Sequence, residues 1–306
     1  MYKEIEYSSG KYNLIYKDLI NESINRVING EYDYNYVSSK GVKELREKIV
    51  EFTNIKDITY HDILVTDSSS DSIRVIASLL NRGDTILVEE FTYFGAIDIF
   101  NQYELNVIKV KLNSNGIDIN DLKDKIKKYN PKMIYVIPTF NNPSGITWNE
   151  LIRKEFIDVI NEYNVSVVED DPYGLISYDN KKYTKLIELD NKHIIYISSF
   201  SKYIAPSFSV GYIISNKSIL DKLYLIKRNE LCSNGFIQYV VLDYLTYNDL
   251  KGIIKEKIRE YKKCLKRSIN YLNINGYDYK FIPKGGIFML VEKDNKISRF
   301  NICYMK

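Results

Sequence analysis

One lysine of this chain stands where a side chain could form a covalent bond with a carbonyl compound. Lys202 closes the segment Ser198-Ser-Phe-Ser-Lys202, which follows the apolar run at 193–197. Burial disfavours the charged form of a lysine, so such a residue can become a neutral amine that attacks a carbonyl carbon. Strands also commonly end in a lysine that reaches solvent, and this segment alone favours that structural explanation.

Three further apolar runs end in polar residues, in a fixed order along the chain. The polar ends are Thr66-Asp-Ser-Ser-Ser-Asp71, Asn141-Asn-Pro-Ser-Gly145 and Glu169-Asp-Asp-Pro-Tyr173. In an open α/β sheet, the ligand crevice lies at the carboxyl ends of the strands. We therefore expect the four polar strand ends to meet at one place.

The elements that must position these residues follow from the alternation of helical and strand patterns. Short apolar strands alternate with helices through the middle of the chain, which predicts an α/β fold with a mostly parallel sheet and helices on both faces. After residue 218 the pattern changes to long helices and then to short β segments. Expected helices are 71–80, 93–101, 121–129, 149–163, 220–229, 235–245 and 249–272, and expected strands are 85–88, 105–110, 133–137, 166–169, 194–198, 210–214, 279–291 and 298–304.

The composition excludes several classes of function. The 306 residues are 45% hydrophobic and 27% charged with a net charge of +3, which is typical of a globular protein. No apolar run approaches the roughly 20 residues of a membrane span, and the N-terminus has no signal-peptide core. Lysines alternate with acids, as at 256–263, which indicates a solvated helix face rather than a nucleic-acid surface. Three scattered cysteines and two histidines argue against a metal site. We expect a cytoplasmic protein without membrane, nucleic-acid or metal partners.

Six short motifs occur in a fixed order: Gly41-Val-Lys-Glu-Leu-Arg46, Gly83-Asp-Thr-Ile-Leu-Val-Glu-Glu-Phe-Thr-Tyr93, Asn142-Pro-Ser-Gly145, Asp170-Asp-Pro-Tyr173, Ser199-Phe-Ser-Lys202 and Gly285-Gly-Ile-Phe288. Together they resemble fold-type I pyridoxal-phosphate enzymes of the class I/II aminotransferase group. The resemblance is greatest to aminoadipate-type aminotransferases and to the aminotransferase-like domain of MocR-type regulators. It implies a seven-stranded type of sheet, a large cofactor-binding domain at 36–235, and a small α+β domain formed by 1–35 and 236–306.

The resemblance assigns the reactive end of pyridoxal 5′-phosphate to four residues. Lys202 would form the Schiff base and later shuttle the substrate Cα proton. Asp170 would keep the pyridine nitrogen protonated, so that the ring acts as an electron sink. Tyr173 and Asn142 would bind the ring O3′, although Asn-Pro-Ser-Gly is equally a good turn sequence.

Two other carboxylates compete with Asp170 for the pyridine nitrogen. Adjacent side chains of a strand point to opposite faces, so only one of Glu169 and Asp170 can enter the crevice. The spacing to Tyr173 favours Asp170. Asp171 is better explained as the N-cap of a following helix, in an Asp-Pro turn.

The phosphate group needs backbone N–H groups and hydroxyls, which a helix N-terminus supplies. By resemblance Ser69 and Ser70 are its ligands, and an N-capping role for this serine cluster can hold simultaneously. We expect the carboxylates of Asp67 and Asp71 to point away from a dianion.

Further contacts with the cofactor are implied by the resemblance. Tyr93 would stack on the pyridine ring, the alternative being packing on a neighbouring phenylalanine. Ser199 would add a phosphate hydroxyl, and Ser201 is a further candidate ligand of the cofactor. Tyr36 matches a tyrosine that reaches the phosphate of the neighbouring subunit, which implies a homodimer.

The first departure from the family pattern lies after the lysine. Relatives usually read Ala-Pro-Gly-Leu-Arg-Leu-Gly there, and that arginine pairs with the phosphate. Here the segment is Ala205-Pro-Ser-Phe-Ser-Val-Gly211, with Ser209 in the place of the arginine. Loss of a charge-assisted bond costs roughly 1.5–3 kcal/mol, so we expect cofactor binding weakened by about 10- to 150-fold at most.

The second departure lies in the small domain. Relatives continue from Gly285-Gly-Ile-Phe288 through a helix and a strand, whereas here a short segment leads directly to Arg299. Arg299 resembles the clamp for the substrate α-carboxylate, because its planar fork pairs bidentately with a carboxylate. The alternative is a surface arginine. We expect a reduced small domain, with side-chain specificity set partly by the N-terminal segment around Gly10.

The leading expectation is a pyridoxal-phosphate-dependent aminotransferase that moves an amino group from an amino acid to a 2-oxo acid. A decarboxylase, cyclase, racemase or oxidase stays open, because the ring serves any Cα carbanion chemistry. A non-catalytic protein that senses cofactor or ligand is the third alternative, favoured by the missing arginine. A complete MocR-type regulator is not expected, since no DNA-binding helices stand at the N-terminus.

Overall fold

A seven-stranded sheet forms the centre of the protein. The computed structural model describes residues 3–4, 16–30, 35–230 and 232–304. The strand order is β2-β10-β9-β8-β7-β3-β4, in which β10 is antiparallel to both of its neighbours and all other pairs are parallel. The strands are β2 (Ile63–Thr66), β3 (Thr85–Glu89), β4 (Asn106–Val110), β7 (Met133–Val136), β8 (Ser166–Asp170), β9 (Ile194–Ser199) and β10 (Gly211–Ile214).

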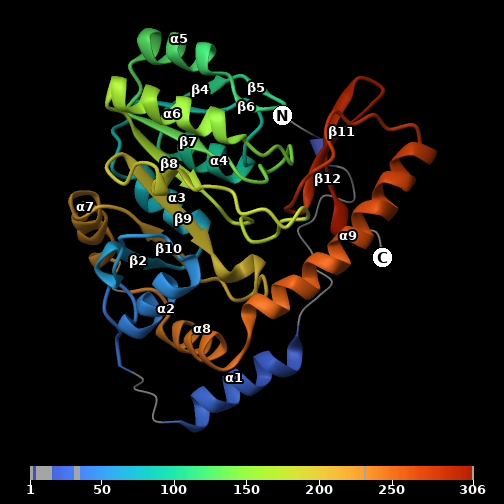
Figure 1. The fold of residues 1–306 in the computed structure, drawn as a ribbon. Helices are drawn as coiled ribbons and strands as arrows, with labels where there is room; N and C mark the ends of the chain where they lie inside the picture. The colour runs from blue at the N-terminus through green and yellow to red at the C-terminus, as the bar shows by residue number, and fades with distance from the viewer. Residues whose placement is uncertain (1–2, 5–15, 31–34, 231, 305–306) are drawn as a thin grey trace.

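Helices cover both faces of this sheet (Figure 1). Neighbouring residues of a strand contribute to opposite cores: Ile86 and Val88 pack with the residues of α3 and α4, whereas Leu87 packs with those of α5 and α6. Because both faces are buried, the strands are almost continuously apolar, as is usual for parallel sheets. The helices are α2 (Lys43–Thr53), α3 (Ser69–Ala77), α4 (Phe94–Gln102), α5 (Ile119–Tyr129), α6 (Glu150–Tyr163) and α7 (Lys217–Arg228). The expected fold class is confirmed.

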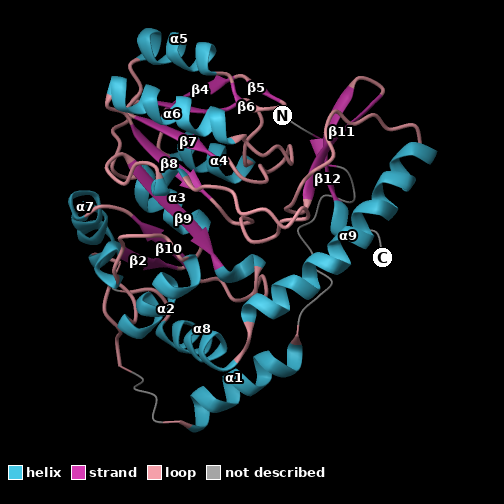
Figure 2. Cartoon of the chain, viewed as in Figure 1, coloured by secondary structure: helices cyan, strands magenta, loops and turns pink. Residues whose placement is uncertain are grey.

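Three further helices and a small sheet flank the main sheet. Helix α8 packs against α1 and α2, and the long helix α9 runs beside a three-stranded sheet of order β1-β12-β11 (Figures 1 and 2). Residues Asp294 and Asn295, both with positive φ, join β11 directly to β12 in a tight hairpin. The elements are α1 (Lys17–Asn29), α8 (Gly235–Tyr247), α9 (Leu250–Ile274), β1 (Lys3–Glu4), β11 (Phe288–Lys293) and β12 (Lys296–Asn301), with a minor hairpin β5 (Leu112–Asn113) and β6 (Gly116–Ile117).

The expected boundaries are wrong mainly near the end of the chain. The β segment expected at 279–291 begins only at Phe288, because Pro283 lacks a backbone donor and Gly286 takes a positive φ. The last expected strand ends at Asn301 and continues as a 3₁₀ turn at Ile302–Tyr304. The division into domains at residues 36–235 stays a prediction.

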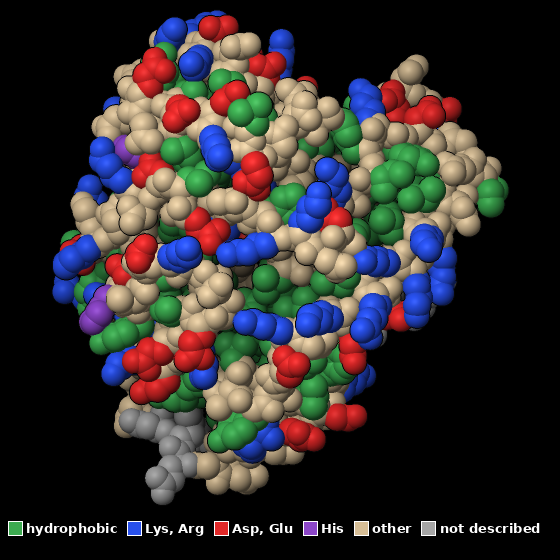
Figure 3. Space-filling model, in the orientation of Figure 1, with side chains coloured by type: hydrophobic (Ala, Val, Ile, Leu, Met, Phe, Trp, Pro, Cys, Tyr) green, Lys and Arg blue, Asp and Glu red, His purple; other side chains and the backbone are tan. Residues whose placement is uncertain are grey.

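The surface carries both signs of charge, interspersed over the face drawn in Figure 3. A notch separates the body of the molecule from the lobe that contains β11, β12 and α9 in the same view. Among the helices that the structure describes, none combines the length and the apolar character that a membrane crossing requires.

Candidate active site

The polar strand ends surround one cleft of about 300 Å³. Its walls come from the start of α3, the start of α4, the turn after β7, the end of β8, the turn after β9, and the strands β11 and β12. This is the carboxyl edge of the parallel strands, where an open α/β sheet binds its ligands. The predicted residues that line the cleft are Ser69, Ser70, Tyr93, Asn142, Asp170, Tyr173, Ser201, Lys202, Ser209 and Arg299.

Lys202 lies at the end of a 3₁₀ turn, Phe200–Lys202, that follows β9. The turn is anchored by the buried ring of Phe200, which packs on the rings of Phe52 and Tyr212 at 5.2 and 5.5 Å. Burial lowers the pKa of the Lys202 ammonium, while the carboxylate of Asp170 opposes that shift. A partly buried amine with a lowered pKa is suited to attack a carbonyl carbon.

A second lysine supports the turn that carries Lys202. The Nζ atom of Lys257, on α9, donates to the backbone carbonyls of Tyr203 and Ile204 at 2.6 and 3.2 Å. These carbonyls follow a helical turn and have no intrahelical partner there, so an ammonium group is a fitting cap. No pattern in the sequence indicates this role of Lys257, which lies far along the chain in an ordinary lysine-rich helix.

Asp170 ends β8 with one carboxylate oxygen held and the other unused. Its Oδ2 accepts a hydrogen bond from the hydroxyl of Tyr135 at 2.5 Å. Its Oδ1 is buried and has no hydrogen-bond partner among the residues that the structure describes. Burial raises the pKa of Asp170 to about 7, and the charge of Asp171 adds to this rise. The site therefore holds a buried carboxyl oxygen for which the described residues offer no donor.

The neighbours of Asp170 are engaged elsewhere. Glu169 points to the opposite face of the sheet and accepts from the backbone N–H groups of Leu186 and Ile187 at 2.8 and 3.0 Å. Asp171 accepts from the hydroxyl of Tyr196 at 2.8 Å. The carboxylate that lines the cleft is thus Asp170, as the alternation of side chains along the strand predicts. The expected N-cap role of Asp171 is wrong, since the chain after it makes turns and no helix begins there.

Asn142 is presented by a turn that a buried carboxylate organises. Glu89, at the end of β3, accepts from Ile137 N, Asn141 Nδ2 and Trp148 Nε1 at 2.7, 2.8 and 2.9 Å. Burial raises the pKa of Glu89 to about 8. The adjacent Asn142 lines the cleft, and its buried Oδ1 has no hydrogen-bond partner in the described part of the chain. Asn142 therefore stands in a turn that also lines the cleft, and its contact with a ring O3′ stays a prediction. No pattern in the sequence indicates the role of Glu89 in this turn.

The start of α3 forms a serine-lined end of the cleft. Ser68 is the N-cap and accepts from the backbone N–H of Asp71 at 3.0 Å, while Ser69 and Ser70 lie in the first turn and line the cleft. Ser209 also lines this end, and its hydroxyl donates to the carbonyl of Asp67 at 2.7 Å. The N–H groups and hydroxyls together suit an anion.

The two aspartates near this helix start do not line the cleft. Lys227, on α7, contacts Asp67 at 3.2 Å and Asp71 at 2.9 Å, and Arg74 contacts Asp71 at 2.7 Å. Both carboxylates are thus neutralised within the protein rather than facing the serine-lined end. Lys227 is a third functional support that sequence reasoning did not find.

Arg299 reaches the cleft from β12. Its guanidinium lies 4.7 Å from the centre of the Phe288 ring and 5.2 Å from that of Phe94. At these distances a guanidinium is attracted to the ring by a cation–π interaction. Phe94 is 51% exposed, so the arginine lies between a buried ring and a ring at the mouth of the cleft.

Tyr93 both lines the cleft and packs on its neighbour. Its ring is 5.3 Å from that of Phe94, edge to face, and its hydroxyl is 3.5 Å from Ser70 Oγ. Gly95 makes room for this arrangement, because a Cβ there would lie 2.5 Å from a ring carbon of Tyr93.

Two of the predicted residues that the structure describes, Ser199 and Tyr36, lie outside the cleft lining. Ser199 is buried at the end of β9, where its hydroxyl is 2.8 Å from that of Ser201. Tyr36 is 84% exposed beside the start of α8, next to Asn234 and Phe236. Gly10 falls outside the described residues.

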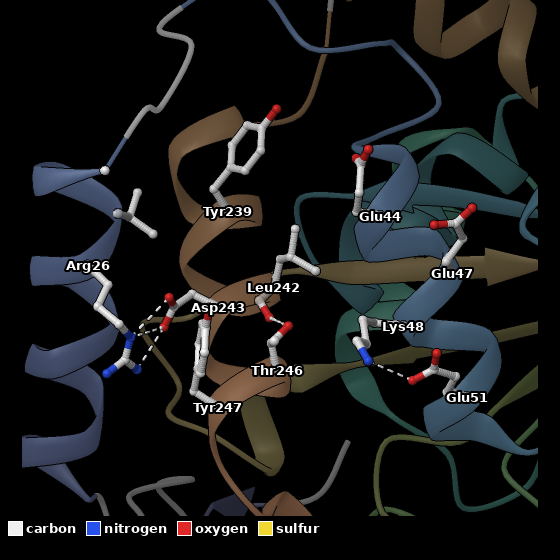
Figure 4. A pocket seen from close by; sticks show the side chains of 12 residues that line it. Arg26, Glu44, Glu47, Lys48, Glu51, Tyr239, Leu242, Asp243, Thr246 and Tyr247 are labelled. Carbon is white, nitrogen blue, oxygen red and sulfur yellow. Dashed lines mark hydrogen bonds and ion pairs between the residues drawn. The ribbon is translucent and has the colours of Figure 1, made fainter.

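A larger hollow of about 480 Å³ lies elsewhere, between α1, α2 and α8 (Figure 4). Several of the charged groups that line it are paired with one another: Arg26 with Asp243 at 2.9 Å, and Lys48 with Glu51 at 2.8 Å. None of the polar strand ends contributes to it. The smaller cleft is therefore the candidate active site.

Comparison with known proteins gives one family for nearly the whole chain. A sequence profile described as "Aminotransferase class I and II" matches residues 6–301. Aromatic-amino-acid aminotransferase 1 of Thermococcus litoralis is 30% identical over 83% of this chain, which spans 64% of that relative's length.

Solved structures share the fold. The kynurenine aminotransferase of Pyrococcus horikoshii superposes with a TM-score of 0.88 at 31% identity, covering 94% of this chain and 75% of its own. The α-aminoadipate aminotransferase of Thermus thermophilus, solved with N-(5′-phosphopyridoxyl)-L-leucine, has a TM-score of 0.88 at 25% identity, covering 94% and 76%.

Proposed function

Because the chain belongs to the class I and II aminotransferases, a family of fold-type I enzymes that use pyridoxal 5′-phosphate, we propose that it transfers the amino group of an amino acid to a 2-oxo acid. The observation that carries the proposal is the convergence of Lys202, Asp170 and Asn142 in one cleft. The two latter side chains each keep a buried oxygen for which the described residues offer no hydrogen-bond donor. Orphaned buried acceptors are costly, so they imply a ligand that supplies donors.

The residues that line the cleft fit the ring nitrogen, the ring O3′ and the phosphate of the cofactor. Asp170 Oδ1 would accept from the protonated ring nitrogen, and Asn142 and Tyr173 would bind the ring O3′. Ser69, Ser70, Ser201 and Ser209 would hold the phosphate with the N-terminus of α3, with Ser199 supporting Ser201 from behind. When bound, pyridoxal phosphate supplies an electron sink for negative charge at the substrate Cα.

The chain's own residues would then carry out binding and proton transfer. Lys202 would hold the cofactor aldehyde covalently and, once displaced by substrate, move the Cα proton as a base whose pKa burial has lowered. Arg299 would bind the substrate α-carboxylate with its fork. Tyr93 would cover one face of the ring and exclude water from it.

The walls of the cleft favour an apolar substrate side chain. Beyond Asp170, Lys202 and Arg299, the described lining contains no charged residue. Phe94 and Phe288 flank the arginine that would hold the substrate carboxylate. We therefore expect an aromatic or large apolar amino acid to be the better donor, since no second cation is at hand for a side-chain carboxylate.

This substrate preference has a direct test. Phe94→Ala should lower kcat/KM for phenylalanine by roughly tenfold or more, as expected for removing a large apolar contact, and affect a small donor such as alanine far less. Leu225→Ala, at an exposed residue of α7 that does not line the cleft, is the matched control. Equal losses for both donors would refute the assignment of Phe94 to the side-chain pocket.

The working unit is proposed to be a cytoplasmic homodimer. The supporting observation is Tyr36, whose highly exposed ring lies apart from the cleft of its own subunit. In a dimer it would reach the phosphate end of the partner's cleft. Tyr36→Phe should weaken binding of phosphorylated cofactor, and light scattering should give twice the mass of one chain.

Transamination is tested by the fate of both substrates. Purified protein loaded with pyridoxal phosphate is incubated with phenylalanine and 2-oxoglutarate, and glutamate and the new 2-oxo acid are quantified. A transaminase gives them in equal amounts, and Lys202→Ala gives neither. Release of carbon dioxide, peroxide or racemised phenylalanine without glutamate would instead indicate another Cα reaction, and cofactor binding without turnover would indicate a sensor.

A further inference from the structure

Tyr135 occupies a position that directs it to the cofactor-facing carboxylate. In the parallel register of β7 and β8, Tyr135 pairs with Val168, and Asp170 follows two residues later on the same face of the sheet. A tyrosine is long enough to cross to that second position along the neighbouring strand. The register thus explains why this hydroxyl, and none from the other face, meets Asp170 at 2.5 Å.

The side chain of Tyr135 is buried and packed against an aromatic ring. Its side chain is fully buried, and its ring packs edge to face on Phe100 at 5.6 Å. Burial raises the pKa of Tyr135 well above its usual value, and the nearby charge of Asp170 acts in the same direction. The hydroxyl therefore keeps its proton near neutral pH and donates it to the ionised carboxylate of Asp170.

The hydrogen bond from Tyr135 affects the ionisation of Asp170, because other groups around this carboxyl favour its neutral form. Burial and the charge of Asp171 both favour the neutral acid, whereas Tyr135 and the charge of Lys202 favour the carboxylate. A neutral Asp170 could not hold a proton on a ring nitrogen. The balance between burial and these two partners decides whether the carboxyl is ionised near neutral pH.

We propose that Tyr135 is a positioning residue for Asp170: its hydroxyl fixes one carboxylate oxygen, keeps the group ionised, and leaves the other oxygen directed at the ring nitrogen of the cofactor. This inference rests on the proposed function, since it assumes that pyridoxal phosphate occupies the cleft. The hydrogen bond joins residues that are 35 positions apart in the chain, and no sequence pattern indicates it.

The test compares two Tyr→Phe variants, one on each of the strands β7 and β9 that flank β8. Tyr135→Phe removes only the hydroxyl that reaches Asp170. Tyr196→Phe removes a hydroxyl that donates to Asp171 at 2.8 Å, also buried but outside the cleft lining. The Kd of each cofactor-free protein for pyridoxal phosphate is measured by fluorescence titration from about pH 5.5 to pH 9, a range that spans the titration of a carboxyl with a raised pKa.

We expect the ratio of the Kd of Tyr135→Phe to the Kd of wild type to depend on pH. Loss of a hydrogen bond to a charged acceptor should raise the midpoint for ionisation of Asp170 by about one pH unit. Tyr135→Phe should therefore bind about tenfold more weakly than wild type at acid pH and equally well at the alkaline end of the range. Tyr196→Phe should follow wild type throughout.

Several outcomes would overturn the inference. A ratio near one at every pH, or an equal shift in Tyr196→Phe, would remove the special role of Tyr135. If none of the proteins binds pyridoxal phosphate at any pH, the proposed function itself fails, which is a separate and recognisable result.

A measurement on the wild-type fold covers the case in which Tyr135→Phe does not fold. A hydroxyl proton in a short hydrogen bond to a carboxylate resonates far downfield in the proton NMR spectrum. The cofactor-free wild type should show such a signal, and Asp170→Asn should lack it. A spectrum unchanged by Asp170→Asn would overturn the assignment.

Discussion

Replacement of Ser209 by arginine should tighten binding of the phosphorylated cofactor. The residue is exposed, lines the serine-rich end of the cleft, and stands where the family resemblance of the sequence predicts a phosphate-binding arginine. Among the described residues, the only cations in the cleft lining are Lys202 and Arg299, which belong to its other functions. Ser209→Arg would supply the missing charge next to the start of α3.

The magnitude follows from what is gained and what is lost. A hydrogen bond between a guanidinium and a phosphate contributes about 1.5–3 kcal/mol. The substitution also removes the hydrogen bond from Ser209 to the Asp67 carbonyl, but the variant lacks that bond with and without cofactor, so its loss affects folding stability and not Kd. We expect the gain at the lower end of its range, about 1.5 kcal/mol, or roughly a tenfold lower Kd. Because the position is exposed, the gain should shrink as salt is added.

The assay measures Kd for pyridoxal phosphate and for unphosphorylated pyridoxal on cofactor-free protein. Ser209→Arg should lower the first about tenfold and leave the second unchanged, because only the phosphate meets the new charge. Ser207→Arg, at an exposed residue two positions away that does not line the cleft, adds the same charge as a control. Equal effects of both variants, or an unchanged Kd for Ser209→Arg, would refute the assignment of Ser209.

Three further predictions concern the supports of the site. Lys257→Met should lower the free energy of unfolding by about 1–3 kcal/mol in urea, because two carbonyls lose their donor, whereas Lys255→Met, at an exposed position of the same helix, should change it little. Gly95→Ala should raise the Kd for pyridoxal phosphate roughly tenfold by displacing the neighbouring tyrosine ring, and an unchanged Kd would contradict the packing argument. Burial raises the pKa of Asp170 to about 7 and that of Glu89 to about 8 in the folded protein, so the folded chain binds protons that the unfolded chain has lost above about pH 4. The free energy of unfolding of cofactor-free protein should therefore fall as pH rises from about 4 to 8, and a rise over that range would show that these groups do not dominate.

The sequence alone predicted which candidate residues meet in the cleft, because each of them follows its own strand closely. The order of polar strand ends predicted that Lys202, Asp170 and Asn142 would meet, and the cleft contains all three. The two-residue period of a strand separated Asp170 from Glu169, which binds backbone N–H groups on the other face.

The supporting residues could not be predicted in the same way. Tyr135 meets Asp170 only because of the register between β7 and β8, and among 28 tyrosines its type carries no signal. Lys257 and Lys227 lie in helices whose lysines look like a solvated face. Their partners are 54 and about 160 residues distant, so only the fold reveals them.

The end of the chain was predicted least well, for a related reason. Pro283 and a glycine of positive φ delay β11, and a two-residue turn then joins it directly to β12. The hairpin nevertheless brings Arg299 to the cleft beside Phe288.

The most direct test of the whole account is chemical trapping of the cofactor on the protein. Cofactor-loaded protein is treated with sodium borohydride, digested, and mapped by mass spectrometry, with Lys202→Ala as the control. The account predicts one phosphopyridoxyl group on the peptide that contains Lys202 and none in the variant. Modification at another lysine, or none at all in protein saturated with cofactor, would contradict it.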